Sequence, residues 1–233
     1  MHPNNFSQQI IDQALEQRGA LHPLADFNPA QAALLVINMQ QFYLDRNPAA
    51  GSLCADINRL ATSIRLGGGQ VAWLSTTFDH TDPAQWSHYF DKLLSSAQRD
   101  AHLSGLAQDS ASWQLASDLR VADQDWRVPV CRFSALAPGA SDLQARLRER
   151  EIDTVLIAGI DTNISCESTG RDAMMLNLAT IMVADCCAAA SDAAHMAALE
   201  NFQVSFGDVL TVDQVLAGID QTVRINHAEL STG

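Results

Sequence analysis

The stretch VLIAGIDTNISCESTGRDAMMLNLATIMVADC, residues 155–186, reads as a strand, a turn, a helix and a second strand. An apolar run of strand length comes first, a more polar segment of helical length follows, and a second apolar run closes the unit. Strands and helices in this order form parallel sheets through right-handed crossovers. The turn carries Ser165 and Cys166 side by side, where such a sheet places its ligands, beyond the carboxyl end of a strand.

The same alternation extends along the chain in both directions. Runs of strand length occupy 32–38, 70–78, 127–133, 153–160 and 180–186, and a short strand and helix follow at 207–219. Helical patterns occupy 6–19, 53–69, 83–97, 140–151, 163–178 and 191–204, whereas 98–125 is polar and has no clear pattern. We therefore expect an α/β fold, a three-layer α-β-α domain around a mostly parallel, about six-stranded sheet.

Composition limits the class of protein. At 233 residues and 47% hydrophobic, the chain can bury one sizeable core. No apolar run reaches the ~18 residues of a membrane-spanning helix, and the N-terminus lacks the pattern of a signal peptide, so we expect a cytoplasmic protein without a membrane partner. The net charge of −13 disfavours nucleic acid as a partner, because phosphate binding needs clustered Lys and Arg.

Cysteines and histidines give little support for a metal. The five cysteines have an odd count and no C-x-x-C spacing, which disfavours a zinc site or a disulfide framework. His195 lies on an amphipathic helix and is expected to be structural. One loop gathers candidate ligands, and a solvated loop is the favoured interpretation: Asp79, His80, Asp82 and His88. We expect no metal and no cofactor.

Four segments carry a resemblance to a known family: LLVINMQQFYL, VCRFSAL, GIDTNISCESTGRDAMMLN and NFQVSFGDVLTVDQV. The chain resembles the isochorismatase-like hydrolases, small α/β cysteine hydrolases that include nicotinamidases, N-carbamoyl amidases and ureidoacrylate amidohydrolases. The third segment is most similar to the ureidoacrylate branch. The resemblance implies an N-terminal helical extension at 1–28, an isochorismatase-like domain of Rossmann type at 29–233, and a homo-oligomer, dimer or tetramer, with helix 6–19 packed across a subunit boundary.

The resemblance also implies a catalytic triad. The family has an Asp after the first strand, a Lys on the third and a Cys at the turn; the thiolate attacks a carbonyl, the Asp transfers a proton and the Lys stabilises charge. These positions fall on Asn38, Val130 and Ser165. An amide does not exchange a proton near neutral pH, a serine hydroxyl is a weak nucleophile without a base, and valine has no charge. Lys92 is the only lysine of the chain.

Two neighbouring residues are alternatives for the missing groups. Arg132 lies two residues along the strand from Val130 and is expected on the same face, although a guanidinium cannot shuttle protons. Cys166 follows Ser165, and one step along a helix rotates a side chain by ~100°, so a packed thiol is the alternative to a reactive one. Ser165 in turn either takes part in the chemistry or caps the helix.

The remaining expected site residues would bind a ligand. The resemblance implies a cis peptide between Ile160 and Asp161 that aims an N–H group into the pocket. Gln40, Phe42 and Trp86 are candidates for its walls, with the core or an interface as the alternative for the two aromatic residues.

Two functions stay open at this point. The chain is either a hydrolase of small amide, ureido or carbamoyl compounds with altered chemistry, or a catalytically silent relative. A silent relative would bind either a protein or a small carboxylate, amide or ureido compound.

Overall fold

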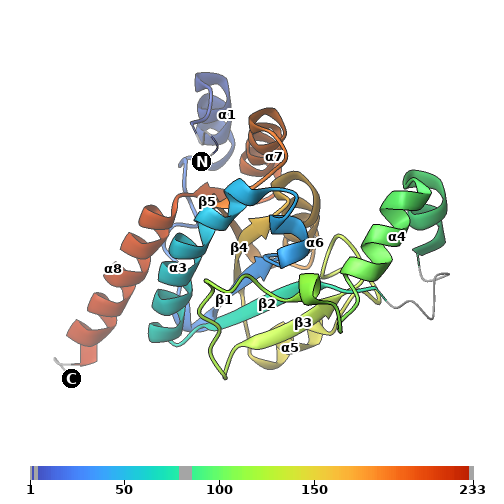
Figure 1. Cartoon of the computed structure of the whole chain (residues 1–233). Helices are drawn as coiled ribbons and strands as arrows, with labels where there is room; N and C mark the ends of the chain where they lie inside the picture. The colour runs from blue at the N-terminus through green and yellow to red at the C-terminus, as the bar shows by residue number, and fades with distance from the viewer. Residues whose placement is uncertain (1, 3–4, 79–85, 231–233) are drawn as a thin grey trace.

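The parallel sheet expected from the sequence forms the centre of the molecule (Figure 1). The computed structural model describes residues 2, 5–78 and 86–230, with 223–230 by their backbone alone. Within these residues the sheet has six strands, all parallel, in the order β3-β2-β1-β4-β5-β6. They are β1 (Ala32–Ile37), β2 (Gln70–Thr76), β3 (Trp126–Val130), β4 (Thr154–Ile160), β5 (Ala179–Ala188) and β6 (Asp208–Leu210).

The burial of the strands explains their apolar sequences. All six residues of β1 are buried. Alternate side chains beginning with Ala32 belong to one apolar cluster, and those beginning with Ala33 belong to a second cluster on the other face of the sheet. A central strand covered on both faces therefore reads as a continuous apolar run. Pro129, which donates no backbone hydrogen bond, lies in β3 at the edge of the sheet, where it is tolerated.

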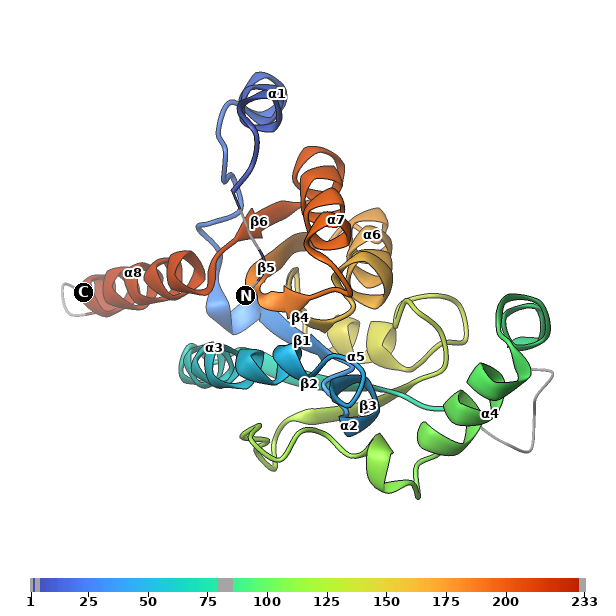
Figure 2. The same cartoon turned by 45° about the horizontal axis from the view of Figure 1, so that its top comes forward.

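Helices cover both faces of this sheet, as Figures 1 and 2 show together. One face carries α3 (Cys54–Leu66) and α8 (Val212–Leu230). The opposite face carries α5 (Leu143–Glu149), α6 (Glu167–Met175) and α7 (Asp192–Ser205). The three-layer α-β-α prediction is confirmed. The strand order reverses between β1 and β4, and ligands of such sheets bind at this switch point, beyond the carboxyl ends of the strands.

The N-terminal helix α1 (Gln8–Arg18) projects from the body of the molecule beside α7 (Figures 1 and 2). It begins at Ser7, whose hydroxyl accepts from a backbone N–H of the first turn, and it ends at Gly19 in the left-handed conformation. Ala14 is its only buried residue, and Leu15 exposes 43% of its surface.

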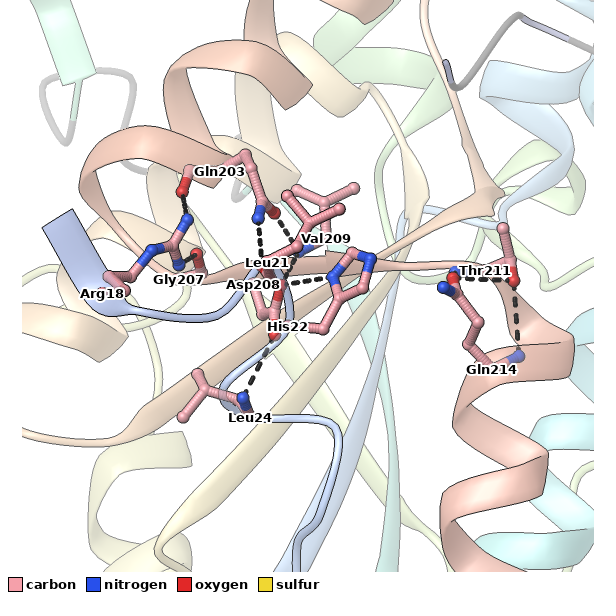
Figure 3. A network of polar contacts seen from close by, with 10 residues as sticks. All are labelled: Arg18, Leu21, His22, Leu24, Gln203, Gly207, Asp208, Val209, Thr211 and Gln214. Atoms are coloured by element: carbon pink, nitrogen blue, oxygen red, sulfur yellow. Dashed lines mark hydrogen bonds and ion pairs between the residues drawn. The ribbon is translucent and has the colours of Figure 1, made fainter. Parts of the chain in front are cut away.

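Polar contacts fasten the segment after α1 to the edge of the sheet (Figure 3). The guanidinium of Arg18 donates to the backbone carbonyls of Gln203 and Gly207. The fully buried carboxylate of Asp208 accepts from the ring of His22 at 2.9 Å and from a backbone N–H of the same segment at 3.1 Å. The N-terminal segment thus completes the hydrogen bonding of α7 and β6.

The segment 83–97 differs from the single helix expected there. Its first three residues lie outside the described part of the chain. A π-helical turn, η4 (Tyr89–Leu93), is followed by extended backbone at Leu94, and α4 (Ser96–Gly105) begins anew. Ser95 and Gln98 form a capping box that satisfies the N–H groups at the start of α4, so the break is stable.

Shorter turns complete the described chain. They are η1 (Pro29–Gln31), α2 (Gln41–Leu44), η2 (Pro48–Leu53), η5 (Ala111–Trp113) and η6 (Thr162–Cys166). Among the helices of the described residues, none has the length and apolar character required to cross a membrane.

Candidate functional site

A chain of hydrogen bonds joins the carboxyl ends of β1, β2 and β4. The hydroxyl of Thr76 donates to Oδ1 of Asn38 at 2.7 Å, and Nδ2 of Asn38 donates to Oγ of Ser165 at 3.1 Å. The three residues expose only 6%, 3% and 4% of their surface in that order. This Thr76–Asn38–Ser165 chain is therefore buried and contains no charged group.

The backbone around this chain is unusual at three points. Asn38 adopts a left-handed conformation with φ of 55°, which asparagine tolerates better than most residues. Gly159 has φ of 120°, and a Cβ there would lie 2.0 Å from the carbonyl oxygen of Ile37. The peptide bond between Ile160 and Asp161 is cis, as the resemblance implies. These features place the turn after β4 directly against the end of β1.

The turn itself separates Ser165 from Cys166. The carbonyl of Asp161 accepts from the backbone N–H groups of Ile164 and Cys166, both at 3.1 Å, which gives η6 its wide π-helical form. Ser165 lies within this turn, faces Asn38 and is not its capping residue. Cys166 is fully buried in the apolar cluster and contacts the thiol of Cys187. The Ser165 side chain therefore belongs to the hydrogen-bond chain, whereas the Cys166 side chain belongs to the apolar core.

Val130 and Arg132 lie on the third strand and just beyond it. The Val130 side chain packs in the same apolar cluster as Ile37 and Cys166, and its carbonyl accepts from the N–H of Thr77 at 2.8 Å. The guanidinium of Arg132 lies 5.2 Å from the centre of the Trp86 ring, and its Nη1 donates to the Cys131 carbonyl at 2.7 Å. The apolar side chain of Val130 thus belongs to the core, whereas Arg132 lies beside aromatic rings.

Gln40 holds two backbone segments together. Its Nε2 donates to the carbonyl of Thr76 at 3.1 Å and to that of Trp113 at 2.9 Å. Oε1 is buried and accepts no hydrogen bond from the residues that the structure describes. Phe42 is a core residue whose ring lies 3.6 Å below the guanidinium of Arg46. Ile160 is buried in the core.

An aromatic cluster adjoins the site. Trp86 stacks on Tyr89 with ring centres 4.3 Å apart and meets Phe133 edge to face at 4.9 Å. Phe133 exposes 38% of its surface, so this end of the cluster reaches solvent. Five cavities of about 190–360 Å³ on the described part of the chain have other residues on their walls than Asn38 or Ser165.

Three ionisable groups around the turn have shifted pKa values. Burial raises the pKa of Asp161 to about 6. Burial raises the pKa of Tyr43 well above its usual value, against a hydrogen bond with Thr76 that lowers it. Burial also lowers the pKa of His195 to about 4; its Nδ1 is 2.9 Å from the hydroxyl of Thr162. At neutral pH, Asp161 is therefore the only one of these three with a charge.

Sequence reasoning named Asn38 and Ser165, which a hydrogen bond joins, but named neither Thr76 nor Tyr43, whose pKa depends on Thr76. Thr76 ends the strand next to β1, so the rule that sites form at neighbouring strand ends could have identified it. Tyr43 gave no comparable signal. Among the described residues, no group of three or more His, Cys, Asp or Glu is arranged to hold a metal. Asp79, His80 and Asp82 lie outside the described residues.

A doubly wound parallel sheet, with polar side chains at its switch point and a cis peptide before a helix, defines the class of α/β enzyme folds to which the chain belongs. The family model of the isochorismatase domain matches residues 32–214, and the chain is a member of this family.

Relatives and solved structures agree with this assignment. The chain is 28% identical to the ureidoacrylate amidohydrolase RutB of Stutzerimonas stutzeri over 228 residues, which cover 90% of this chain and 91% of that one. It is 29% identical to the isochorismatase family protein YecD of Escherichia coli O157:H7, over 83% of this chain and 98% of that one.

Two solved structures share the fold. A cysteine hydrolase from Pseudomonas syringae pv. phaseolicola superposes with a TM-score of 0.70 at 23% identity, over 84% of this chain and 95% of that one. N-carbamoylsarcosine amidase from Thermoplasma acidophilum superposes with a TM-score of 0.61 at 20% identity, over 78% and 96%.

Proposed function

We propose that this chain is a catalytically silent relative of the amidohydrolases that binds a small planar amide, ureido or carboxylate compound without cleaving it at the rate of a cysteine hydrolase. The observation that carries this proposal is the Thr76–Asn38–Ser165 chain of neutral hydrogen bonds. The relatives named above include an amidohydrolase and an amidase, which supports a ligand of this chemical class.

The chemistry of the chain supports the loss of catalysis. The Ser165 oxygen accepts a hydrogen bond from the Asn38 amide nitrogen, and the Asn38 oxygen accepts one from Thr76. If the nitrogen and oxygen of the Asn38 side-chain amide exchanged places, the group facing Ser165 would still be neutral. A general base contributes roughly 10²–10⁴-fold to a reaction rate, and an amide cannot act as one. Val130 supplies no charge, and Cys166 is buried beside Cys187.

Other features support retention of binding. A helix that starts at a turn leaves backbone N–H groups without intrahelical partners, and such groups bind oxygen atoms of a carbonyl or an anion. These donors do not depend on the side chains that have changed. The turn with its cis peptide remains at the switch point of the sheet.

Ammonia release from ureidoacrylate and N-carbamoylsarcosine tests the catalytic half of the proposal. We expect rates at least ~10³-fold below an intact family member, since an amide and a hydroxyl occupy the positions that the resemblance assigns to the catalytic carboxylate and the thiolate. The double variant Asn38→Asp with Ser165→Cys should gain little, whereas addition of Val130→Lys should raise the rate further. Hydrolysis by the unchanged chain at an ordinary enzymatic rate would refute the proposal.

We also propose a cytoplasmic location and a homo-oligomer. All five cysteines are unpaired, which supports a reducing compartment. The projecting α1, with Leu15 exposed, supports contact with a second copy of the chain. Light scattering should give a dimer or tetramer at micromolar concentration, and Leu15→Glu should weaken it; a monomer for the unchanged chain would contradict this.

A further inference from the structure

Asp161 is a charged residue that the hydrogen-bond chain does not use. It follows the cis peptide and precedes the turn that carries Ser165. Its backbone carbonyl is committed to the turn, where it accepts from Ile164 and Cys166. Its side chain is half-buried and interacts electrostatically with Tyr43, whose pKa also depends on Thr76. The carboxyl group therefore belongs to the same rim as the Thr76–Asn38–Ser165 chain.

This carboxylate has no partner among the described residues. No described side chain or backbone N–H donates to it, and no described cation lies close enough to alter its pKa. The position that the resemblance assigns to a lysine holds Val130, and Arg132 contacts Trp86 and the Cys131 carbonyl. A partly desolvated carboxylate without a donor costs free energy, which a ligand with N–H groups would recover.

A second acceptor at this rim is also without a donor. Both hydrogens of the Gln40 amide are directed to backbone carbonyls, one of them that of Thr76. Two carbonyl partners fix which end of the amide is nitrogen, because an oxygen there would face acceptors on both sides. Oε1 therefore stays buried with no donor among the described groups. Two acceptors of this site therefore have no donor among the described residues.

We propose that Asp161 makes this site selective for ligands that present N–H groups on a planar carbon, with an amidine or guanidine cation bound best, a neutral amide next and a carboxylate bound most weakly. The inference rests on the proposed function, because it names the ligand class of that same site. Asp161 acts as the residue that determines specificity. The N–H groups of the turn hold the carbonyl oxygen of an amide ligand, whereas an amidinium or guanidinium binds through its charge and N–H groups to Asp161.

The electrostatics of Asp161 predict how this selectivity depends on pH. With a pKa raised to about 6 by burial, the carboxyl is ionised at pH 7.5 and mostly protonated at pH 5. Tyr43 on α2, which interacts electrostatically with Asp161, has a raised pKa and is neutral over this range. His195 on α7, bonded to the neighbouring Thr162, has a pKa lowered to about 4 and is mostly neutral as well. The contact with Cys166, together with burial, raises the pKa of the Cys187 thiol on β5. The preference for a cation should therefore fade through about pH 6, and binding near that pH should release a proton.

Three probes of equal shape test the inference: benzamidine, benzamide and benzoate, each titrated calorimetrically into the full chain. At pH 7.5 we expect binding in that order, with benzoate weakest. Asp161→Asn should weaken benzamidine by about 10–100-fold, the range of a charge-assisted hydrogen bond, and should remove the proton release seen in buffers of different ionisation enthalpy. Asp185→Asn is the matched control, since Asp185 is also partly buried with a raised pKa but accepts from the N–H of Val212.

The outcomes distinguish the two proposals. Binding that is lost in Ser165→Leu, or in the milder Ser165→Val if the first does not fold, places the probes at this site and supports the proposed function. If benzoate then binds as tightly as benzamidine, or if Asp161→Asn leaves the order of the three affinities unchanged, the proposed selectivity is refuted. The proposed binding site is retained in that case. If no probe binds, or if binding survives both serine variants, the proposed function is refuted and the selectivity with it.

Discussion

At the scale of single residues, Gly159 determines how closely β4 approaches β1 behind the site. A Cβ at this position would lie 2.0 Å from the Ile37 carbonyl oxygen, and φ is 120°. Gly159→Ala should therefore lower the free energy of unfolding by about 3 kcal/mol or more, because backbone strain and steric overlap add. Denaturant unfolding measures this, with Gly51→Ala as the control, since nothing lies within 4 Å of a Cβ at Gly51. Equal effects of the two variants would contradict the argument.

Thiol reactivity is a second property of individual residues. Cys131 is partly exposed, whereas the other four cysteines are buried. Burial raises the pKa of Cys186 well above its usual value, and a contact with Cys166 together with burial raises that of Cys187. Since the thiolate is the reactive form, iodoacetamide should modify Cys131 first and the buried thiols only on unfolding. Mass spectrometry of timed samples checks this. Rapid, selective modification of Cys166 would instead revive cysteine catalysis.

The site was only partly predictable from its residues. Asn38 and Ser165 follow apolar runs, and the convergence of strand ends in a parallel sheet brings them together, here within a hydrogen bond of 3.1 Å. The direction of the Asn38 amide depends on Thr76, and hence on the pairing of β1 with β2, which no local pattern specifies. The surroundings of the Asp161 carboxylate, which has no donor among the described residues, likewise depend on the tertiary fold and not on local sequence.

At the scale of elements, the contact between α7 and η6 makes stability depend on pH. His195 keeps a neutral ring against Thr162, and burial with the stacked His2 lowers its pKa to about 4. Between pH 6.5 and 4, the unfolded chain binds a proton here that the folded chain does not, so stability falls as pH falls. His195→Asn retains a hydrogen-bonding group without this titration. Wild type should lose about 1–2 kcal/mol more than the variant between pH 7 and pH 5.

Denaturant unfolding at both pH values measures that difference. Asp161 acts in the opposite direction, because burial raises its pKa and protonation then favours the folded state, but its contribution is common to both proteins. The comparison therefore isolates the histidine. Equal pH dependence of the two proteins would show that His195 titrates normally in the fold.

The elements themselves were predictable where burial is two-sided. The run at 32–38 corresponds to β1 and that at 153–160 to β4, because a strand covered on both faces must be apolar throughout. The prediction of a single helix at 83–97 was wrong because the apolar spacing there does not reveal where the helix breaks. Its apolar residues pack into a small aromatic cluster at the rim, and the break is made by the Ser95 capping box, whose hydrogen bonds leave the apolar spacing unchanged.

At the scale of the whole molecule, the first residues of the chain are joined to its last elements. The sequence predicted an extension at 1–28 beside a domain at 29–233, and that division stays a prediction. The contacts of Arg18 and His22 with Gln203, Gly207 and Asp208 show that the buried polar groups of α7 and β6 depend on the extension (Figure 3). We therefore propose that the domain is not fully stable without it.

Removal of residues 1–24 tests this dependence. The truncation takes away the ring and the backbone N–H that bond to Asp208, which is fully buried, and the carbonyl that the Gln203 amide contacts. A buried carboxylate that loses a partner typically costs about 3–5 kcal/mol, and we expect a loss of that order in denaturant unfolding. Removal of 1–16 alone, which keeps Arg18 and His22, should cost much less.

A double-mutant cycle with Asp208→Asn identifies the charge as the cause. In the full chain this variant weakens the contact with His22 but leaves an amide that is cheaper to bury alone, so truncation should cost less in the variant than in wild type. The two changes should thus be non-additive by about 1–3 kcal/mol. Additive effects would mean that the extension stabilises the molecule through its apolar contacts and not through Asp208. Two-state unfolding of all four proteins, followed by both fluorescence and circular dichroism, is the condition for the comparison.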